Sequence, residues 1–161
     1  MLTAEELRER LDYDPETGVF TWRRSESTRV KIGGVAGTYT EKGYVRVRVL
    51  GRPYRAHRLA WLYVRGVWPQ DQIDHINGIR DDNRIENLRE ATNAENQRNM
   101  KKRAGKRCAL KGVHVANGRF RAVITVAYKR FYLGNYNTEE EAHAAYVAAA
   151  EKEFGAFARA E

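Results

Sequence analysis

Few of the features that mark exported, membrane-spanning or disulfide-bonded proteins occur in this 161-residue sequence. It holds one cysteine, Cys108, so an internal disulfide and a zinc site built on paired cysteines are excluded. No apolar run approaches the ~18 residues that a membrane-spanning helix needs. The first residues, MLTAEELRERL, carry acidic side chains where a secretory signal has a basic and then an apolar stretch. We therefore expect an intracellular, cytoplasmic protein with no membrane association, large enough for one ordinary domain or two small ones.

Acidic residues are also missing from one long stretch of the C-terminal third. The whole chain has 29 Lys and Arg against 21 Asp and Glu, a formal net charge of +8. Residues 101–130 contain ten of the basic residues and no acidic one. Such a stretch is typical of a surface that neutralises phosphates. The alternative is a solvated linker next to an ordinary basic surface, which we disfavour because the charged run continues into strand-like sequence.

The first of three segments, residues 1–56, is predicted to be a β-rich support. It opens with a capping box, Thr3 to Glu6, which predicts a short helix. Residues 19–22 are strand-like, and in 43–49 valines alternate with polar residues. The polar face of that second strand consists of Tyr44, Arg46 and Arg48. This face is either solvated or lies along a phosphate backbone.

The second segment, residues 57–100, reads as strand, loop, strand and helix after an opening helix. The opening helix is predicted over 57–65, where Gly66 ends it, and the strands over 72–76 and 88–91. Thr92 to Glu95 forms another capping box, which predicts a helix over about 93–102. This segment is too small to bury much core alone, so we expect it to pack on the first segment.

The third segment, residues 110–161, follows a basic linker over 101–109 and is predicted to be a three-stranded sheet packed on one helix. The strands are expected at 112–115, 119–127 and 130–133, and Asn117-Gly118 is a favoured hairpin turn between the first two. Thr138 to Glu141 caps an alanine-rich helix that ends near Gly155. The fold class expected for the whole chain is therefore α+β.

Candidate chemistry lies in the second segment, at the end of its first strand. Asp74 and His75 are adjacent there, and Asn96 sits in the first turn of the helix that follows. Because that helix packs across the hairpin in a compact unit of this order, Asp74 and Asn96 can face one another. Carboxylate and amide oxygens are hard ligands that suit Mg²⁺ or Mn²⁺. His75, expected on the opposite side unless the strand end is twisted, can take a proton from water at neutral pH.

These three residue types together suggest phosphodiester hydrolysis, although each alone has an ordinary structural interpretation. A histidine at a strand end is commonly a structural residue, and an asparagine in a first helical turn is commonly a cap. Their joint spacing strengthens the functional interpretation, because His75, Asn87 and Asn96 fall at intervals of 12 and 9 residues.

The sequence around these residues resembles the HNH nucleases of the ββα-metal class, in particular the phage and intron homing type. The matching stretches are residues 57–59, 74–78, 82–89 and 92–96. The resemblance implies that Asp74 and Asn96 bind one divalent metal, Mg²⁺ or Mn²⁺, and that His75 is the general base. It implies that Asn87 hydrogen-bonds the loop backbone and fixes the hairpin that aims His75. Arg84 and His57 are candidate phosphate contacts, and His57 is equally a candidate packing residue.

The longest strand of the third segment has one apolar and one polar face. Phe120, Ala122, Ile124 and Val126 share the side expected to face the helix, and Arg121, Val123 and Thr125 share the other. A sheet with arginine on its free face can enter the major groove of DNA.

This segment resembles the plant ethylene-response-factor (APETALA-type) DNA-binding domain. The matching stretches are residues 111–113, 118–122, 132–136 and 138–146, of which the strand–helix junction is the most diagnostic. The family reads DNA from its three-stranded sheet, which nominates His114, Arg119, Arg121, Lys129, Arg130 and Tyr132. His114 stands where an arginine is usual, and Phe120 and Tyr132 stand where tryptophans are usual. The resemblance therefore favours the fold more than any base preference, and a basic sheet without a DNA role is the alternative.

The sequence as a whole predicts a modular DNA endonuclease of the homing type that nicks or cuts double-stranded DNA. Its location would be the cytoplasm of a prokaryote or a phage-infected host, and no protein partner is implied. A non-catalytic DNA-binding regulator is the first alternative. An RNA or polyanion binder is the second, which has little support because Trp22, Trp61 and Trp68 lie outside the basic stretch.

Overall fold

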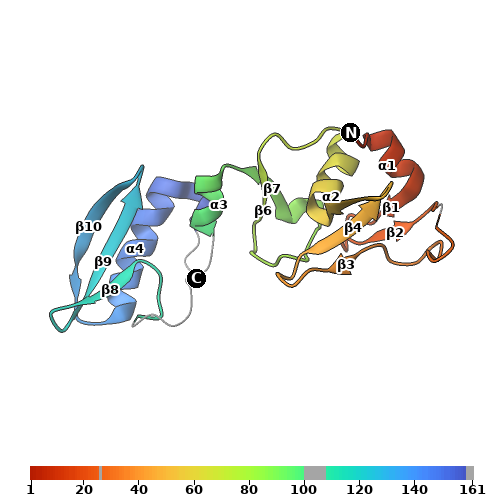
Figure 1. Cartoon of the computed structure of the whole chain (residues 1–161). Coiled ribbons are helices and arrows are strands. Elements are labelled where there is room, and N and C mark those ends of the chain that lie inside the picture. The colour runs from red at the N-terminus through yellow and green to blue at the C-terminus, as the bar shows by residue number, and fades with distance from the viewer. Residues whose placement is uncertain (26, 100–107, 159–161) are drawn as a thin grey trace. The chain divides into compact units, whose positions relative to one another are not determined.

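Two compact units make up the chain, Met1–Asn93 and Ala94–Glu161. They are seen in a computed structural model that describes residues 1–25, 27–99 and 108–158 (Figure 1). The described residues form several small antiparallel sheets and four α-helices, which confirms the expected mixture of helix and sheet. Most of the linker predicted at 101–109 lies outside the described residues. None of the helices in the described ranges is long and apolar enough to span a membrane.

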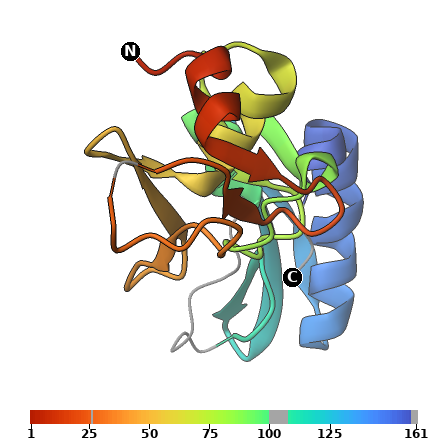
Figure 2. The ribbon, with the colours of Figure 1, turned by 90° about the vertical axis from the view of Figure 1, so that its right-hand side faces the viewer.

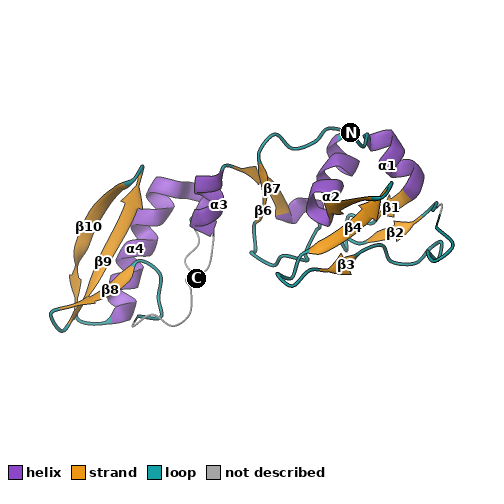
Figure 3. Ribbon diagram, viewed as in Figure 1, coloured by secondary structure: helices purple, strands orange, loops and turns teal. Residues whose placement is uncertain are grey.

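The first unit contains three small sheets and two helices (Figure 3). In chain order its elements are α1 (Ala4–Arg10), β1 (Leu11–Tyr13), β2 (Phe20–Trp22), β3 (Thr38–Tyr39), β4 (Val45–Val49), β5 (Arg52–Arg55), α2 (Ala56–Arg65), β6 (Gln72–His75), the 3₁₀ turn η1 (Ile85–Asn87) and β7 (Leu88–Ala91). The sheets are β1–β2, β3–β4–β5 and β6–β7, all antiparallel.

One hydrophobic core joins the predicted support segment to the predicted nuclease segment. Its buried side chains come from α1, β2, β4, α2, β6 and β7, and include Leu7, Phe20, Val47, Leu59, Ile73 and Leu88. Residues 57–93 alone are too few to bury a sufficient hydrophobic core. The shared core supplies the apolar contacts that they lack. Residues of the segment 1–56 contribute to this core, and the supporting role expected for the segment stays a prediction.

The helix start, the helix end and the burial pattern predicted for the first unit are present in the structure. Thr3 and Glu6 form the predicted capping box at the start of α1. Gly66 ends α2 in the left-handed conformation, with φ of 77°, which a residue with a side chain adopts at a cost. In β4, Val47 and Val49 are buried while Arg46 and Arg48 are exposed, so the predicted alternation is confirmed.

The second unit contains a three-stranded sheet and a long helix. Its elements are α3 (Asn93–Asn99, which begins at the border of the units), β8 (Val113–Ala116), β9 (Arg119–Val126), β10 (Lys129–Tyr136), α4 (Glu139–Phe154) and the 3₁₀ turn η2 (Gly155–Phe157). The strand order is β10–β9–β8, and α4 lies along one face of the sheet (Figures 1 and 2). The helix predicted over 93–102 is seen as far as Asn99, and the rest of that prediction lies outside the described residues.

Packing in the second unit follows the predicted faces. Ala122 and Ile124 of β9 are buried against α4, where Ala142 and Tyr146 are buried in turn. The predicted turn at Asn117-Gly118 has positive φ at both residues, as a two-residue hairpin requires. The strand β10 is longer than the predicted 130–133, because a bulge between Tyr132 and Gly134 lets pairing with β9 continue to Tyr136.

Candidate active site

The hairpin β6–β7 presents Asp74 and His75 on opposite faces. Asp74 pairs in register with Arg89, and His75 pairs with Leu88. Successive side chains of a strand alternate, so His75 shares the core-facing side with Leu88 while Asp74 lies on the other side with Arg89. Both residues are buried, each 5% exposed. The sequence pattern anticipated this opposition of the carboxylate and the imidazole.

His75 is held by a small polar and aromatic cluster. The ring of His57 stands perpendicular to the ring of His75 at a centroid distance of 5.0 Å, and the ring of Tyr44 lies at 6.0 Å. Asn83 places its Oδ1 3.4 Å from Nε2 of His75, while its own Nδ2 donates to the carbonyl of Asp81 at 3.0 Å. Because Asn83 uses its amide nitrogen elsewhere, its Oδ1 favours the neutral tautomer of His75 that carries the proton on Nε2 and the lone pair on Nδ1.

The protonation state of His75 follows from its burial. Burial lowers the pKa of His75, and the hydrogen bond to Asn83 and the nearby carboxylates, Asp74 foremost, oppose that effect. A histidine with a lowered pKa is neutral at pH 7, which is the form that accepts a proton. Asn83 was not selected from the sequence, and an asparagine in a polar loop carries no signal that would single it out.

His57 is a packing residue in this structure. It is 8% exposed, and its Nδ1 finds no hydrogen-bond partner among the described residues. Burial first, and then the neighbouring His75 and Arg55, lower the pKa of His57 to about 3. Of the two roles that the sequence left open for His57, the buried neutral ring fits packing and not phosphate contact.

Asp74 forms a buried ion pair with Arg89. Nε and Nη2 of Arg89 both donate to Oδ2 of Asp74, at 2.9 and 2.8 Å. The two side chains are 15% and 5% exposed, so the pair holds the carboxylate in one orientation. Arg89 was not selected from the sequence, although opposite charges at facing positions of paired strands are a recognisable pattern.

The donor chemistry at Asp74 and Asn96 suits a hard divalent cation. A carboxylate and an amide oxygen are the ligands that Mg²⁺ and Mn²⁺ prefer. In the described ranges no group of three or more His, Cys, Asp and Glu side chains is arranged to hold a metal. Asn96 itself lies on α3, at the start of the second unit.

The loop between β6 and β7 is tied together by Asn87. Its Oδ1 accepts from the backbone N–H of Asn77 at 3.0 Å, and its Nδ2 donates to the carbonyl of Asp82 at 2.9 Å. The backbone carbonyl of Asn87 also accepts from the N–H of Ile76 at 2.9 Å. These are the loop hydrogen bonds that the resemblance implied, and they fix the segment that directly follows His75.

Arg84 is engaged by two carboxylates. Its Nε and Nη2 donate to Asp82, both at 2.8 Å, and its Nη1 donates to Glu86 at 2.9 Å. The Arg84 hydrogen bonds hold the pKa of Asp82 at about 2. The guanidinium nominated for phosphate contact is therefore largely neutralised within its own loop.

Two arginines that were not nominated lie beside the His75 cluster. Arg55 and Arg80 stack on the ring of Tyr44, with centroid distances of 5.0 and 5.3 Å. Arg80 also donates to the carbonyl of Lys42 at 2.9 Å, and Arg55 donates to Thr40 Oγ1 at 3.2 Å. The contacts of Arg80 join the loop after β6 to the β3–β4 turn, and those of Arg55 join the end of β5 to the same turn. Positive charge therefore lies next to the candidate base.

Residues 54–98 match the family model of the HNH endonucleases. The match begins in β5 and ends in α3, and it contains Asp74, His75, Asn87 and Asn96. It supports nuclease activity on DNA, and HNH nucleases typically use divalent metal ions. No curated protein matches the chain. The family match covers neither residues 1–53 nor the C-terminal sheet.

The free face of the second unit's sheet is hollowed into a groove of about 640 Å³. Four of the six residues nominated for DNA contact line it: His114, Arg121, Arg130 and Tyr132. Arg121 stacks on the ring of Tyr132 at 5.5 Å. Alternation along β9 places Arg119 on the same face.

Lys129 does not share that face. It pairs with Val126, whose side chain packs toward α4, so Lys129 lies on the helix side of the sheet.

Proposed function

We propose that this protein is a metal-dependent HNH endonuclease of the homing type that nicks or cuts double-stranded DNA. The observation that carries the proposal is the buried, neutral His75, oriented by Asn83, inside the segment that matches the family. In the proposed reaction Nδ1 of His75 takes a proton from the water that attacks the phosphodiester. Asn87 acts indirectly, because it holds the loop that follows His75.

Asp74 and Asn96 are the proposed ligands of Mg²⁺ or Mn²⁺. Such a metal, when bound, polarises the phosphate and stabilises charge on the leaving oxygen. Arg89 orients the Asp74 carboxylate through Oδ2. The fit rests on the oxygen donors, which suit these ions better than they suit zinc.

The second unit is proposed to supply DNA affinity as a domain of the ethylene-response-factor type. Support comes from the groove on the free face of its sheet, where Arg121, Arg130 and Tyr132 gather beside His114. A sheet bearing arginine suits the major groove of DNA. Arg119 would add a phosphate contact on the same face, whereas Lys129 lies on the helix side of the sheet and is left out of the proposed interface. Arg84 would contribute little, because Asp82 and Glu86 already neutralise its guanidinium.

Cleavage of supercoiled plasmid and of DNA from the protein's own genomic neighbourhood tests the proposal. Wild type is compared with His75→Ala in Mg²⁺, in Mn²⁺ and in chelator. We expect metal-dependent nicking or linearisation, which falls by roughly 10²–10⁴ in the variant because general-base catalysis contributes about that factor. His143→Gln, which alters a histidine of α4 in the second unit, is the matched control and should cleave normally.

DNA binding by the same proteins completes the test. His75→Ala should bind duplex DNA as tightly as wild type, since the buried imidazole is assigned to chemistry. Binding without cleavage by wild type in either metal would instead favour a non-catalytic DNA-binding regulator.

A further inference from the structure

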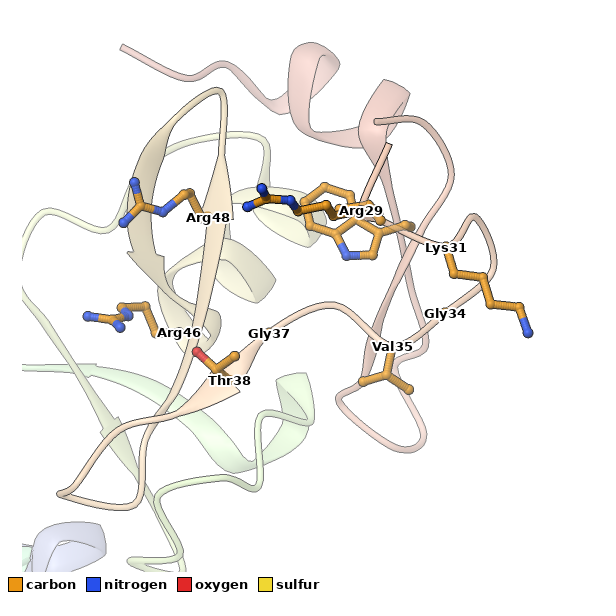
Figure 4. A pocket seen from close by; sticks show the side chains of 10 residues that line it. Arg29, Lys31, Gly34, Val35, Gly37, Thr38, Arg46 and Arg48 are labelled. Carbon is orange, nitrogen blue, oxygen red and sulfur yellow. The ribbon is translucent and has the colours of Figure 1, made fainter. Parts of the chain in front are cut away.

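A basic groove lies on the first unit, outside the segment that matches the nuclease family. It encloses about 380 Å³ between β4 and the chain that precedes β3 (Figure 4). The residues that line it are Trp22, Arg29, Val30, Lys31, Gly34, Val35, Gly37, Thr38, Arg46 and Arg48. Four of these are basic and none is acidic.

The arginines of β4 are aimed outward by the core beneath them. Val47 and Val49 are 0% and 1% exposed, so alternation along the strand sends Arg46 and Arg48 to the opposite face. In Figure 4 these two side chains project side by side from β4. Arg29 reaches toward Arg48 from the facing segment, whereas Lys31 points away.

Among the residues that the structure describes, no acidic side chain lines this groove. Within the described part of the chain, the side chains of Arg29 and Arg46 make no ion pair or hydrogen bond. Arg48 gives one N–H to the carbonyl of Gly51 at 3.1 Å. An adjoining hollow of about 350 Å³ shares Arg48 and Trp22 and adds Arg24. Cations gathered without carboxylates repel one another, and an anionic ligand relieves that repulsion.

Residue spacing matches a regular polyanion. Arg46 and Arg48 are two residues apart on one strand, which is about 7 Å at the usual rise per residue. Each strand of duplex DNA carries one phosphate for every ~3.4 Å of helix axis, so both arginines can meet phosphates of the same strand. The strand β4 follows Tyr44, whose ring lies 6.0 Å from that of His75. A DNA backbone along β4 would therefore lead toward the candidate base.

We infer that the groove formed by Arg29, Arg46 and Arg48 binds the phosphate backbone of duplex DNA. The site is additional to the sheet of the second unit and contacts phosphates without reading bases. This inference rests on the proposed function, because duplex DNA is the substrate proposed there. It gives the first unit a direct part in holding the strand near His75.

Salt dependence of DNA binding by the full chain tests the inference. Binding of a fluorescent duplex is measured by anisotropy in chelator between 50 and 300 mM salt, for wild type and for Arg46→Gln/Arg48→Gln. Each lost phosphate contact lowers the slope of log K against log salt by about 0.9, so the double variant should lose about 1.8. Affinity near 0.1 M salt should fall on the order of 60-fold, and adding Arg29→Gln should lower the slope by about another 0.9.

The matched control removes the same charge elsewhere. Arg65→Gln/Lys152→Gln alters two exposed cations, on α2 and on α4, that line neither groove. Its slope should stay at the wild-type value. Thermal unfolding checks that each variant is folded.

An unchanged slope in folded Arg46→Gln/Arg48→Gln overturns the inference, as does an equal loss in the control, which would reflect net charge alone. A loss seen with a single-stranded oligonucleotide and not with the duplex overturns the duplex assignment. Plasmid cleavage by wild type keeps the two proposals separate. Cleavage with an unchanged slope refutes the groove only, and a lowered slope without cleavage refutes the nuclease only.

Discussion

Replacing Asn83 is the sharpest way to examine how His75 is prepared for proton transfer. Asn83 is 2% exposed, and its side chain makes the hydrogen bonds to His75 and to the Asp81 carbonyl. Asn83→Ala removes both, at roughly 1 kcal/mol each, and leaves a buried N–H of His75 without its acceptor, at roughly 1–3 kcal/mol. The backbone carbonyl that accepts from Tyr13 stays in place. We expect the first unit to lose about 3–5 kcal/mol of unfolding free energy.

The effect of this substitution on catalysis has a definite sign. The hydrogen bond that Oδ1 of Asn83 accepts raises the pKa of His75, because it favours the protonated ring. Its loss lowers that pKa, so the acidic limb of the pH–rate profile should move to lower pH. The plateau rate should fall by about tenfold, a fraction of the 10²–10⁴ assigned to a positioned base, because the tautomer is no longer held. Asn83→Asp keeps an acceptor and adds negative charge, so its acidic limb should move to higher pH.

Single-turnover plasmid cleavage between pH 5 and 9, at fixed saturating Mg²⁺, measures the acidic limb of the pH–rate profile for each variant. Urea unfolding followed by tryptophan fluorescence gives the stability, since Trp22, Trp61 and Trp68 all lie in the first unit. Limbs that stay at the wild-type pH in both variants, or that move in the same direction, would refute the assignment of Asn83 as the positioning residue.

Two further substitutions separate the roles of the units. His57→Leu should make the first unit less sensitive to acid. The pKa of His57 falls from 6.5 to about 3 on folding, so wild-type stability is lost as pH drops below 6.5, by about 2 kcal/mol at pH 5. Urea unfolding at pH 7.5 and 5 should show a drop smaller by that amount in the variant, and an equal drop would contradict the buried neutral imidazole. Gly112→Ala should destabilise only the second unit, by about 2–5 kcal/mol, because φ is +78° there and the new Cβ would lie 2.1 Å from the ring of Tyr146. Far-UV circular dichroism and DNA binding should report the loss while tryptophan fluorescence does not, and a single shared transition shifted in both signals would argue against independent units.

The elements that the sequence predicted well are those set by local chemistry. The capping boxes at Thr3 and Thr138 are present with both of their hydrogen bonds. Asn117-Gly118 forms the hairpin turn, and Gly66 ends α2. Each of these depends on side chains and backbone groups a few residues apart, so neighbouring letters carry the whole signal.

The residues of the candidate site also divide into those that a local pattern identifies and those that only the fold brings together. His75, Asn87 and Asp74 could be named because a spaced motif carries them, and the match over residues 54–98 supports the nuclease interpretation. The partners of these residues could not be named. Asn83 is eight residues from His75 and Arg89 is fifteen from Asp74, and only the folded hairpin brings each pair together. Contacts of that kind depend on strand register and loop path.

The sequence by itself determined that two segments of different character carry a nuclease motif and a basic sheet, because periodicity, turn residues and motif spacing are properties of short stretches. Only the tertiary structure decided which arginine side chains stay available to an anionic ligand. It paired Arg84 with Asp82 and Glu86, and it left Arg46 of β4 exposed in a groove whose described lining residues include no carboxylate. The sequence does not distinguish an arginine that is paired with a carboxylate from one that is exposed, because only the fold determines whether an acidic group lies beside it.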